Sequence, residues 1–353
     1  MSGVMQAPAL ATRLQQGLQW RWQGWLRQRQ RAHLKSLDRQ ENARFNSATP
    51  TLLFVSESLE QDHFYRCLLD WMRVHRPQLR QHVRLDRMPC QAREHGNVAL
   101  LHAWVQDPVR ERDPELWRQL GELEGQVRSS GGEVVQPARV LSHSERVSMM
   151  QRLSSAGVRV ARSAVLDEQF PESLAGLGYP LIVRPRYGHG SGMQRVDERK
   201  DIDTGWARWK SDPAAWVAME YIDVMDDDGY FRKYRYLQVG HQGMPRHLMR
   251  ASHWEVRPEG RIRDPQAQEE ELAYVSGTVP EADLFTRAAR ALEFDVAAFD
   301  YSYDANRELV IWEANPYPDI GLPDERVSHY LQATVERSWA LYCDYYAARA
   351  GLV

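Results

Sequence analysis

The chain has 353 residues, which suits two or three compact lobes rather than one small core. Apolar residues make up 43% and charged residues 26%, and the net charge of −3 gives no overall case for nucleic acid or a membrane. The three cysteines are widely spaced, which fits a reducing compartment and indicates no metal-site pattern. Without a membrane-length apolar run or a recognisable signal peptide, the sequence predicts a cytoplasmic protein.

The first 50 residues carry a basic amphipathic pattern. Leucine or tryptophan recurs every four residues from Leu10 to Leu26, which predicts one apolar stripe along a helix. We expect residues 1–50 to form a helical arm. It would pack on its own protein, dock an acidic partner or a second copy of the chain, lie on a membrane surface or contact nucleic acid, and the pattern leaves these alternatives open.

From residue 51 onward, short apolar runs alternate with helical patterns. The alternation predicts a mainly parallel sheet in an N-terminal α/β domain over residues 51–140. We expect strands at 51–55, 98–105, 133–135, 158–165, 179–183 and 217–222, and helices at 61–74, 113–129 and 144–156. Farther along we expect a hairpin of 234–239 and 245–249 turning at Gln242-Gly243, helices at 281–292 and 327–348, and strands at 296–303 and 308–313.

The last two of these strands carry three oxygen-bearing side chains. Antiparallel pairing would bring Asp300 level with Glu313, and Asn315 lies two residues farther on the same strand face. Three hard oxygen donors at one point suit Mg²⁺, which keeps its other positions for water and phosphate. Solvated carboxylates are the alternative, but both lie within apolar runs, where an unpaired charge is costly.

A glycine-rich loop follows the strand at 179–183. Arg184 and Pro185 end that strand, and the loop reads Tyr187-Gly188-His189-Gly190-Ser191-Gly192-Met193. Glycines let a backbone approach phosphates, and a cation at the strand end would neutralise them. The spacing is neither a Walker loop nor a dinucleotide fingerprint, so an ordinary turn explains it equally well.

The strand at 217–222 ends beside an acidic cluster. Its exit, Glu220-Tyr221-Ile222, can offer backbone groups to a purine edge, and one of Asp226, Asp227 or Asp228 can reach ribose hydroxyls. A buried strand followed by a solvated acidic turn is the alternative.

In this order and spacing, the three elements resemble the ATP-grasp superfamily over roughly residues 140–325. The resemblance implies an α/β ATP-grasp fold, with a central lid subdomain over 141–225 and a C-terminal mixed α+β subdomain over 226–353. It is closest to glutathione synthetase-like ligases and to enzymes that add amino acids to peptides. ATP and Mg²⁺ are the implied cofactors.

The resemblance also assigns roles to residues. Its metal ligands are Asp300, Glu313 and Asn315, its adenine hinge is Glu220 to Ile222, its ribose contact is one of Asp226 to Asp228, and its lid loop over the phosphates is Tyr187 to Met193. Arg184 and Arg146 stand where the superfamily has two phosphate-binding lysines. Arginine keeps the charge with a different geometry, and only four of the 45 basic residues are lysines, so a general bias explains both departures.

Three more cations are candidate catalytic residues. Alternation puts Lys233 and Arg235 on one strand face, and the resemblance places that strand near the γ-phosphate or the acceptor. Arg250 is a candidate contact for an acyl phosphate or a substrate carboxylate, and a surface pair with His253 is the alternative.

The implied activity is that of an ADP-forming ligase, which joins a carboxylate to an amine or thiol through an acyl phosphate. The expected partners are a small-molecule or peptide carboxylate and an amine acceptor. Two alternatives stay open: an ATP-grasp kinase that phosphorylates a hydroxyl, and a nucleotide-binding regulatory protein with little turnover. We expect the acceptor to be read partly by residues 317–324, which carry no decodable motif.

Overall fold

The computed structural model describes residues 49–57, 62–166, 176–188, 192–209, 211–318, 320 and 329–352. Residues from Pro50 onward form one compact unit, which contains every element described below. Residues 1–48 of the predicted helical arm at 1–50 lie outside the described residues. Within the described part, no helix is both long enough and apolar enough to cross a membrane.

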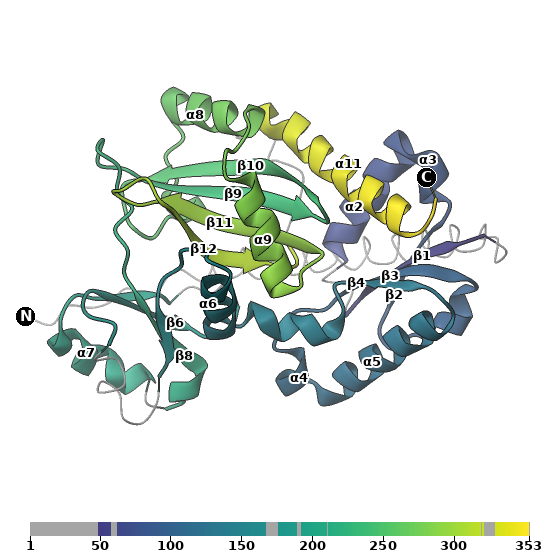
Figure 1. The fold of residues 1–353 in the computed structure, drawn as a ribbon, viewed down its shortest axis with the longest axis horizontal. Helices are drawn as coiled ribbons and strands as arrows, with labels where there is room; N and C mark the ends of the chain where they lie inside the picture. Colours follow the sequence, from purple (N-terminus) through teal and green to yellow (C-terminus); the bar gives the residue numbers. More distant parts are fainter. Residues whose placement is uncertain are drawn as a thin grey trace, which may run out of the picture. The chain divides into compact units, whose positions relative to one another are not determined.

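The first layer is a parallel sheet of four strands in the order β2-β1-β3-β4 (Figure 1). Every residue of β1 is buried, as expected for a strand with neighbours on both sides and helices on its faces. The strands are β1 (Thr51–Ser56), β2 (Val83–Arg87), β3 (Val98–Trp104) and β4 (Glu133–Val135). The helices are α2 (His63–His75), α3 (Pro77–Arg80), α4 (Val109–Arg112) and α5 (Pro114–Ser129), with 3₁₀ turns η1 (Ala92–His95) and η2 (Ala138–Ser144).

A second, smaller sheet is antiparallel and has the order β5-β8-β6-β7. Its small core includes Val183, Val196 and Trp209. The strands are β5 (Ser163–Val165), β6 (Leu181–Pro185), β7 (Gln194–Val196) and β8 (Trp216–Glu220). The helices are α6 (Arg146–Ser155), which precedes the sheet, and α7 (Arg199–Trp209), with the 3₁₀ turn η4 (Pro213–Ala215).

The third sheet is antiparallel, with the order β10-β9-β11-β12. Its strands are β9 (Phe231–Val239), β10 (Gln242–Ala251), β11 (Val296–Tyr303) and β12 (Leu309–Asn315). Its helices are α8 (Pro265–Ser276) and α9 (Ala282–Leu292), with η5 (Pro258–Gly260) and η6 (His329–Leu331). The last helix, α11 (Gln332–Arg349), packs Trp339, Tyr342 and Tyr346 into the same core as β1 and β3. Figure 1 shows α11 beside α2.

The predicted fold class is confirmed, but the short elements α3, α4 and β7 were not predicted, and neither were β2, α7 and α8. The strand β2 is short, and the helix α7 has few apolar residues. The helix α8 buries Glu271 between Ala267 and Val275, so a charge interrupts its apolar stripe. The hairpin of β9 and β10 turns at Gly240-His241 rather than at Gln242-Gly243, because Gly240 adopts a positive φ of 57°.

Candidate functional site

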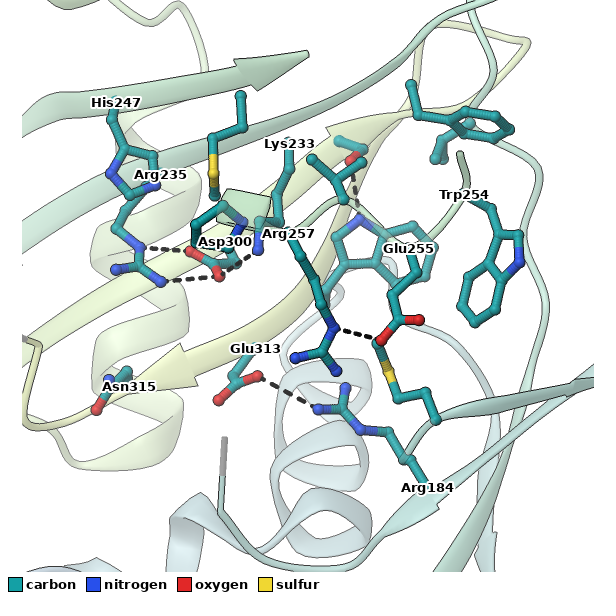
Figure 2. A pocket seen from close by; sticks show the side chains of 18 of the residues that line it. Arg184, Lys233, Arg235, His247, Trp254, Glu255, Arg257, Asp300, Glu313 and Asn315 are labelled. Carbon is teal, nitrogen blue, oxygen red and sulfur yellow. Dashed lines mark hydrogen bonds and ion pairs between the residues drawn. The ribbon is translucent and has the colours of Figure 1, made fainter. Parts of the chain in front are cut away.

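A cavity of about 750 Å³ lies where the two antiparallel sheets face each other, and residues from the end of β3 and the start of α2 also line it. Its polar wall comes from the third sheet: β9 supplies Lys233 and Arg235, β11 supplies Asp300, and β12 supplies Glu313 and Asn315. Figure 2 shows Lys233 and Arg235 beside Asp300, with Glu313 between them and Arg184 from β6, and Asn315 farther along β12. The structure therefore gathers the predicted metal ligands and several predicted cations into one cavity.

Asp300 lies at the centre of the polar wall. The register pairs it with Glu313 on one side and Arg235 on the other. The Arg235 guanidinium donates two hydrogen bonds to its carboxylate, at 2.6 and 2.9 Å, and the Lys233 ammonium lies 3.5 Å away. Burial would raise the pKa of Asp300, but Arg235 and Lys233 outweigh burial and lower the pKa, so the carboxylate is ionised. The predicted same-face placement of Lys233 and Arg235 is confirmed.

A β-bulge explains why two consecutive residues of β12 face the cavity. Asp300 pairs with Glu313 while Tyr301 pairs with Ile311, which leaves Trp312 as the extra residue of β12. Both Trp312 and Glu313 line the cavity. Simple alternation would have placed Trp312 on the opposite face, so no sequence pattern indicated its position.

Glu313 is held by two arginines that come from other parts of the chain. Arg146, at the start of α6, lies 3.3 Å from the Glu313 carboxylate, and Arg184 lies 3.9 Å from it. Arg146 is buried and also donates hydrogen bonds to the carbonyl oxygens of Pro185 and Gly188, at the entry of the glycine-rich loop. Burial, with Arg146 nearby, lowers the pKa of Arg184 to about 9, which still leaves it charged at pH 7.

The donor set of Asp300, Glu313 and Asn315 fits a hard divalent cation. Asp300 is ionised, Glu313 has two arginine neighbours, and the Asn315 side-chain oxygen also accepts a hydrogen bond from the Tyr317 backbone N–H at 2.8 Å. That hydrogen bond orients the amide and leaves its oxygen a second lone pair. Oxygen-only sets of this kind favour Mg²⁺ over softer metals.

The opposite end of the cavity is apolar. Tyr221 and Ile222 leave β8 there, beside Met219, Trp254 and Val256. The predicted hinge therefore lies at a surface that suits a flat ring. The hinge residue Glu220 also lines the cavity, but its carboxylate accepts hydrogen bonds from Arg162.

The segment after β10 also lines the cavity, and sequence reasoning did not find it. It brings Trp254, Glu255, Arg257, Arg261 and Arg263 to the cavity. Figure 2 shows Glu255 and Arg257 paired with each other across from Arg184. The closely spaced charged residues between 255 and 263 were the one feature of the sequence that could have indicated this segment. No motif includes them.

Other predicted residues lie away from the cavity lining. Arg250 is buried, but it donates to Asp264 at 2.8 Å, beside the start of α8, rather than pairing with His253. Asp226 and Asp228 both accept hydrogen bonds from Arg232, which gives no support to a ribose contact.

In the predicted lid loop, Gly188 and Gly192 have φ values of 79° and 113°, which only glycine adopts without strain. Tyr187 carries the Arg186 guanidinium over its ring and does not line the cavity. Gly190 and Ser191 lie outside the described residues.

Solved structures share this architecture over nearly their whole length. The ATP-grasp ligase PsnB with a minimal precursor is 14% identical and aligns over 85% of this chain and 100% of its own, with a TM-score of 0.57. The chain has the ATP-grasp fold. The VanG D-Ala:D-Ser ligase from Enterococcus faecalis is 13% identical over 86% of this chain and 100% of its own, with a TM-score of 0.53. No protein-family model matches the sequence, and no curated protein sequence is detectably similar to it.

Similar structures have been solved with a nucleotide and with magnesium. PsnB has been solved with Mg and ADP, and also with a precursor peptide and AMPPNP. Structural similarity at 13–14% sequence identity shows the fold alone, so activity has to be inferred from the cavity residues.

Proposed function

We propose that this protein is an ADP-forming ligase that uses Mg·ATP to activate a carboxylate as an acyl phosphate and joins it to an amine or thiol. One observation supports the proposal. Three oxygen-bearing side chains, those of Asp300, Glu313 and Asn315, share one cavity of an ATP-grasp fold with the cations Arg184, Lys233 and Arg235. Phosphoryl transfer needs this combination of positioning and charge neutralisation more than it needs an acid or a base.

Asp300, Glu313 and Asn315 would hold the magnesium ion. Bound there, Mg²⁺ would neutralise charge on the phosphate oxygens. The protein's cations complete that neutralisation: Lys233 and Arg235 lie beside Asp300, and Arg146 and Arg184 lie beside Glu313. Arg184, Lys233 and Arg235 line the cavity and would contact phosphate and acyl-phosphate oxygens, whereas Arg146 does not line it and would act from behind Glu313, where it also holds the Pro185 and Gly188 carbonyls.

The apolar end of the cavity would hold the adenine. Ile222 and Val224 belong to a small apolar cluster with Phe231, Met249 and Trp254, which gives the ring a rigid surface. The Arg195 guanidinium lies 4.2 Å from the Tyr221 ring centre and fixes that ring from outside. The hinge would then contact the purine edge through backbone groups.

We further propose that the acceptor enters beside the parallel sheet. Here the lining changes to His63, Phe64, Trp104 and Gln106, which mix aromatic surface with hydrogen-bonding groups. PsnB is solved with a precursor peptide, and VanG is a D-Ala:D-Ser ligase, so a peptide or an amino acid is the class that we propose. Free cysteines and the use of ATP fit a cytoplasmic setting.

Hydroxylamine trapping tests this function. The purified protein is incubated with ATP, Mg²⁺, hydroxylamine and a pool of carboxylates, including amino acids and acidic peptides. We expect hydroxamates and one ADP for each, because hydroxylamine attacks an acyl phosphate.

Two variants make the hydroxylamine result specific. Glu313→Gln should abolish it. Glu308→Gln, on the same hairpin but exposed and paired with Arg159, should leave it unchanged. A phosphate ester in place of the hydroxamates would favour the kinase. Tight Mg·ATP binding without ADP under any condition would favour a regulatory protein.

A further inference from the structure

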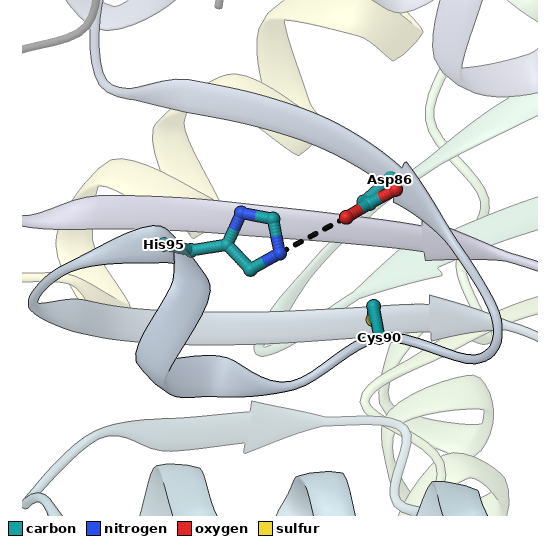
Figure 3. A group of neighbouring side chains, drawn as sticks. All are labelled: Asp86, Cys90 and His95. Atoms are coloured by element: carbon teal, nitrogen blue, oxygen red, sulfur yellow. Dashed lines mark ion pairs between the residues drawn. The ribbon is translucent and has the colours of Figure 1, made fainter.

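The end of β2 and the connection from β2 to β3 bring together three side chains of types that bind metal ions. They are far along the chain from Asp300, Glu313 and Asn315. Asp86 lies near the end of β2, Cys90 lies in the loop, and His95 ends the 3₁₀ turn η1. One ligand atom from each lies within 4.8 Å of the other two. Figure 3 shows the His95 ring directed toward Asp86, with Cys90 beside them.

The His95 ring is buried and poorly satisfied. Its side chain is 8% exposed, and its Nε2 atom lies 3.0 Å from Asp86 Oδ2. Its Nδ1 atom makes no hydrogen bond to any described residue, and Nε2 faces only the Asp86 carboxylate. Buried polar atoms without partners are uncommon and call for an explanation, and a bound ion is one of the standard ones.

The surrounding contacts hold the three ligands in place. Thr51 Oγ1 donates to the His95 carbonyl at 3.1 Å, and the Ala92 backbone N–H donates to the Gln126 side chain at 3.0 Å. The loop is therefore tied to β1 on one side and to α5 on the other. A loop anchored at both ends brings its ligands together at a low entropic cost, which favours metal binding.

A reactive cysteine is the main rival explanation, and the surroundings argue against it. The Cys90 side chain is partly buried, and its charged neighbours Asp86 and Glu94 are carboxylates rather than cations that would stabilise a thiolate. A thiol of this kind is a poor nucleophile, because the thiolate is the reactive form. A metal ion would instead stabilise the thiolate directly.

We propose that Asp86, Cys90 and His95 form a binding site for a borderline transition-metal ion, best matched by Zn²⁺. Sulfur, imidazole nitrogen and carboxylate oxygen are the ligands that zinc takes, and the half-exposed side of Asp86 leaves a fourth position for water. Zinc–ligand distances of about 2.0–2.3 Å need donors about 3.5 Å apart. The 3.0 Å separation of His95 Nε2 and Asp86 Oδ2 would therefore widen slightly, and separations near the 4.8 Å limit would shorten by about 1 Å. The mixed ligand set explains why cysteine spacing alone indicated no metal site.

Cobalt(II) substitution tests the proposal without relying on enzyme activity. The full chain is stripped with a chelator and titrated with Co²⁺ in excess Mg²⁺, which occupies the oxygen-only site. We expect one Co²⁺ per chain with a thiolate-to-cobalt absorption band in the near ultraviolet, displaced by one equivalent of Zn²⁺. Cobalt on Asp300, Glu313 and Asn315 could not give that band, since those ligands lack sulfur.

Variants identify the ligands. Cys90→Ser should abolish the thiolate band, and His95→Gln should weaken Co²⁺ binding by more than about tenfold, because even outer-shell partners of metal ligands contribute about 10- to 100-fold. Cys67→Ser is the matched control, since Cys67 also lies beside a histidine, with its sulfur 3.7 Å from a His63 ring nitrogen. This variant should keep the band.

Three results would overturn the proposal: no thiolate band, a band that survives Cys90→Ser, or a band lost in Cys67→Ser. If Cys90→Ser does not fold, X-ray absorption of the zinc-loaded wild-type protein decides instead. One sulfur neighbour with nitrogen and oxygen neighbours supports the site, and a shell without sulfur refutes it.

Discussion

Arg235 is the principal counter-charge of a buried carboxylate, so its removal should cost stability in a predictable way. Asp300 is 8% exposed and receives two hydrogen bonds from Arg235, while Lys233 lies farther away at 3.5 Å. Removing one partner of a buried ion pair typically costs about 3–5 kcal/mol. Because Lys233 still compensates part of the charge, we expect Arg235→Met to lower the free energy of unfolding by about 3 kcal/mol.

The loss should depend on pH with a defined sign. In the folded wild-type protein the pKa of Asp300 lies below its ordinary value of 3.8. The ionised carboxylate therefore stabilises the fold at pH values above 3.8, and this stabilisation is lost as the pH falls through the lower pKa of the folded state. In Arg235→Met, burial dominates and the pKa of Asp300 rises above its unfolded value. The ionised form then costs stability at neutral pH, and protonation removes that cost. The gap between the two proteins should therefore narrow as the pH falls from 7 toward 4.

Thermal unfolding of the ligand-free proteins measures both effects. For a unit of about 300 residues, 3 kcal/mol corresponds to a fall in Tm of about 5 °C. Arg73→Met is the matched control, because Arg73 pairs with Asp70 on an exposed face of α2 and exposed pairs contribute little. Equal shifts for the two variants, or a gap that stays constant between pH 7 and 4, would refute the reasoning.

Two further predictions concern the buried charges of Arg184, in the same cavity, and of Glu271, on α8. Arg184→Met should weaken Mg·AMPPNP binding by at least about tenfold in calorimetric titration, because it removes a charge-assisted hydrogen bond. Arg184→Lys keeps the charge and should weaken binding less. Equal losses of affinity in the two variants would mean that Arg184 does not act through its charge. Glu271 is fully buried, accepts a hydrogen bond from the Leu248 backbone N–H at 3.2 Å and forms an ion pair with Arg261. Glu271→Ala should therefore lower the free energy of unfolding by about 3 kcal/mol in urea titration, against little change for the exposed neighbour Glu269→Ala.

The parts of the site that the sequence predicted are those fixed by local geometry. Asp300 and Glu313 lie level because a short turn joins two adjacent strands, and Lys233 and Arg235 share a face because side chains alternate along a strand. Periodicity and chain proximity were sufficient for these placements. The bulge at Trp312 escaped prediction because one extra residue breaks that alternation.

The parts that were missed depend on contacts between segments far apart in the chain. Arg146 and Glu313 are 167 residues apart, and nothing in either segment shows that they meet. Similarly, α8 carries the buried Glu271, whose partners Leu248 and Tyr330 lie 23 and 59 residues away in the chain. The buried charge made the apolar pattern of α8 too weak to predict a helix. Tertiary structure decides where such charged groups are satisfied.

The central claim is that Asp300, Glu313 and Asn315 bind Mg·ATP. Calorimetric titration of AMPPNP into wild-type protein and into the Glu313→Ala/Asn315→Ala double variant, each with Mg²⁺ and with EDTA, tests it most directly. We predict that the wild-type protein binds the nucleotide tightly only with Mg²⁺, and that the folded double variant loses this dependence. Equal Mg²⁺-dependent affinity in the two proteins would contradict the account.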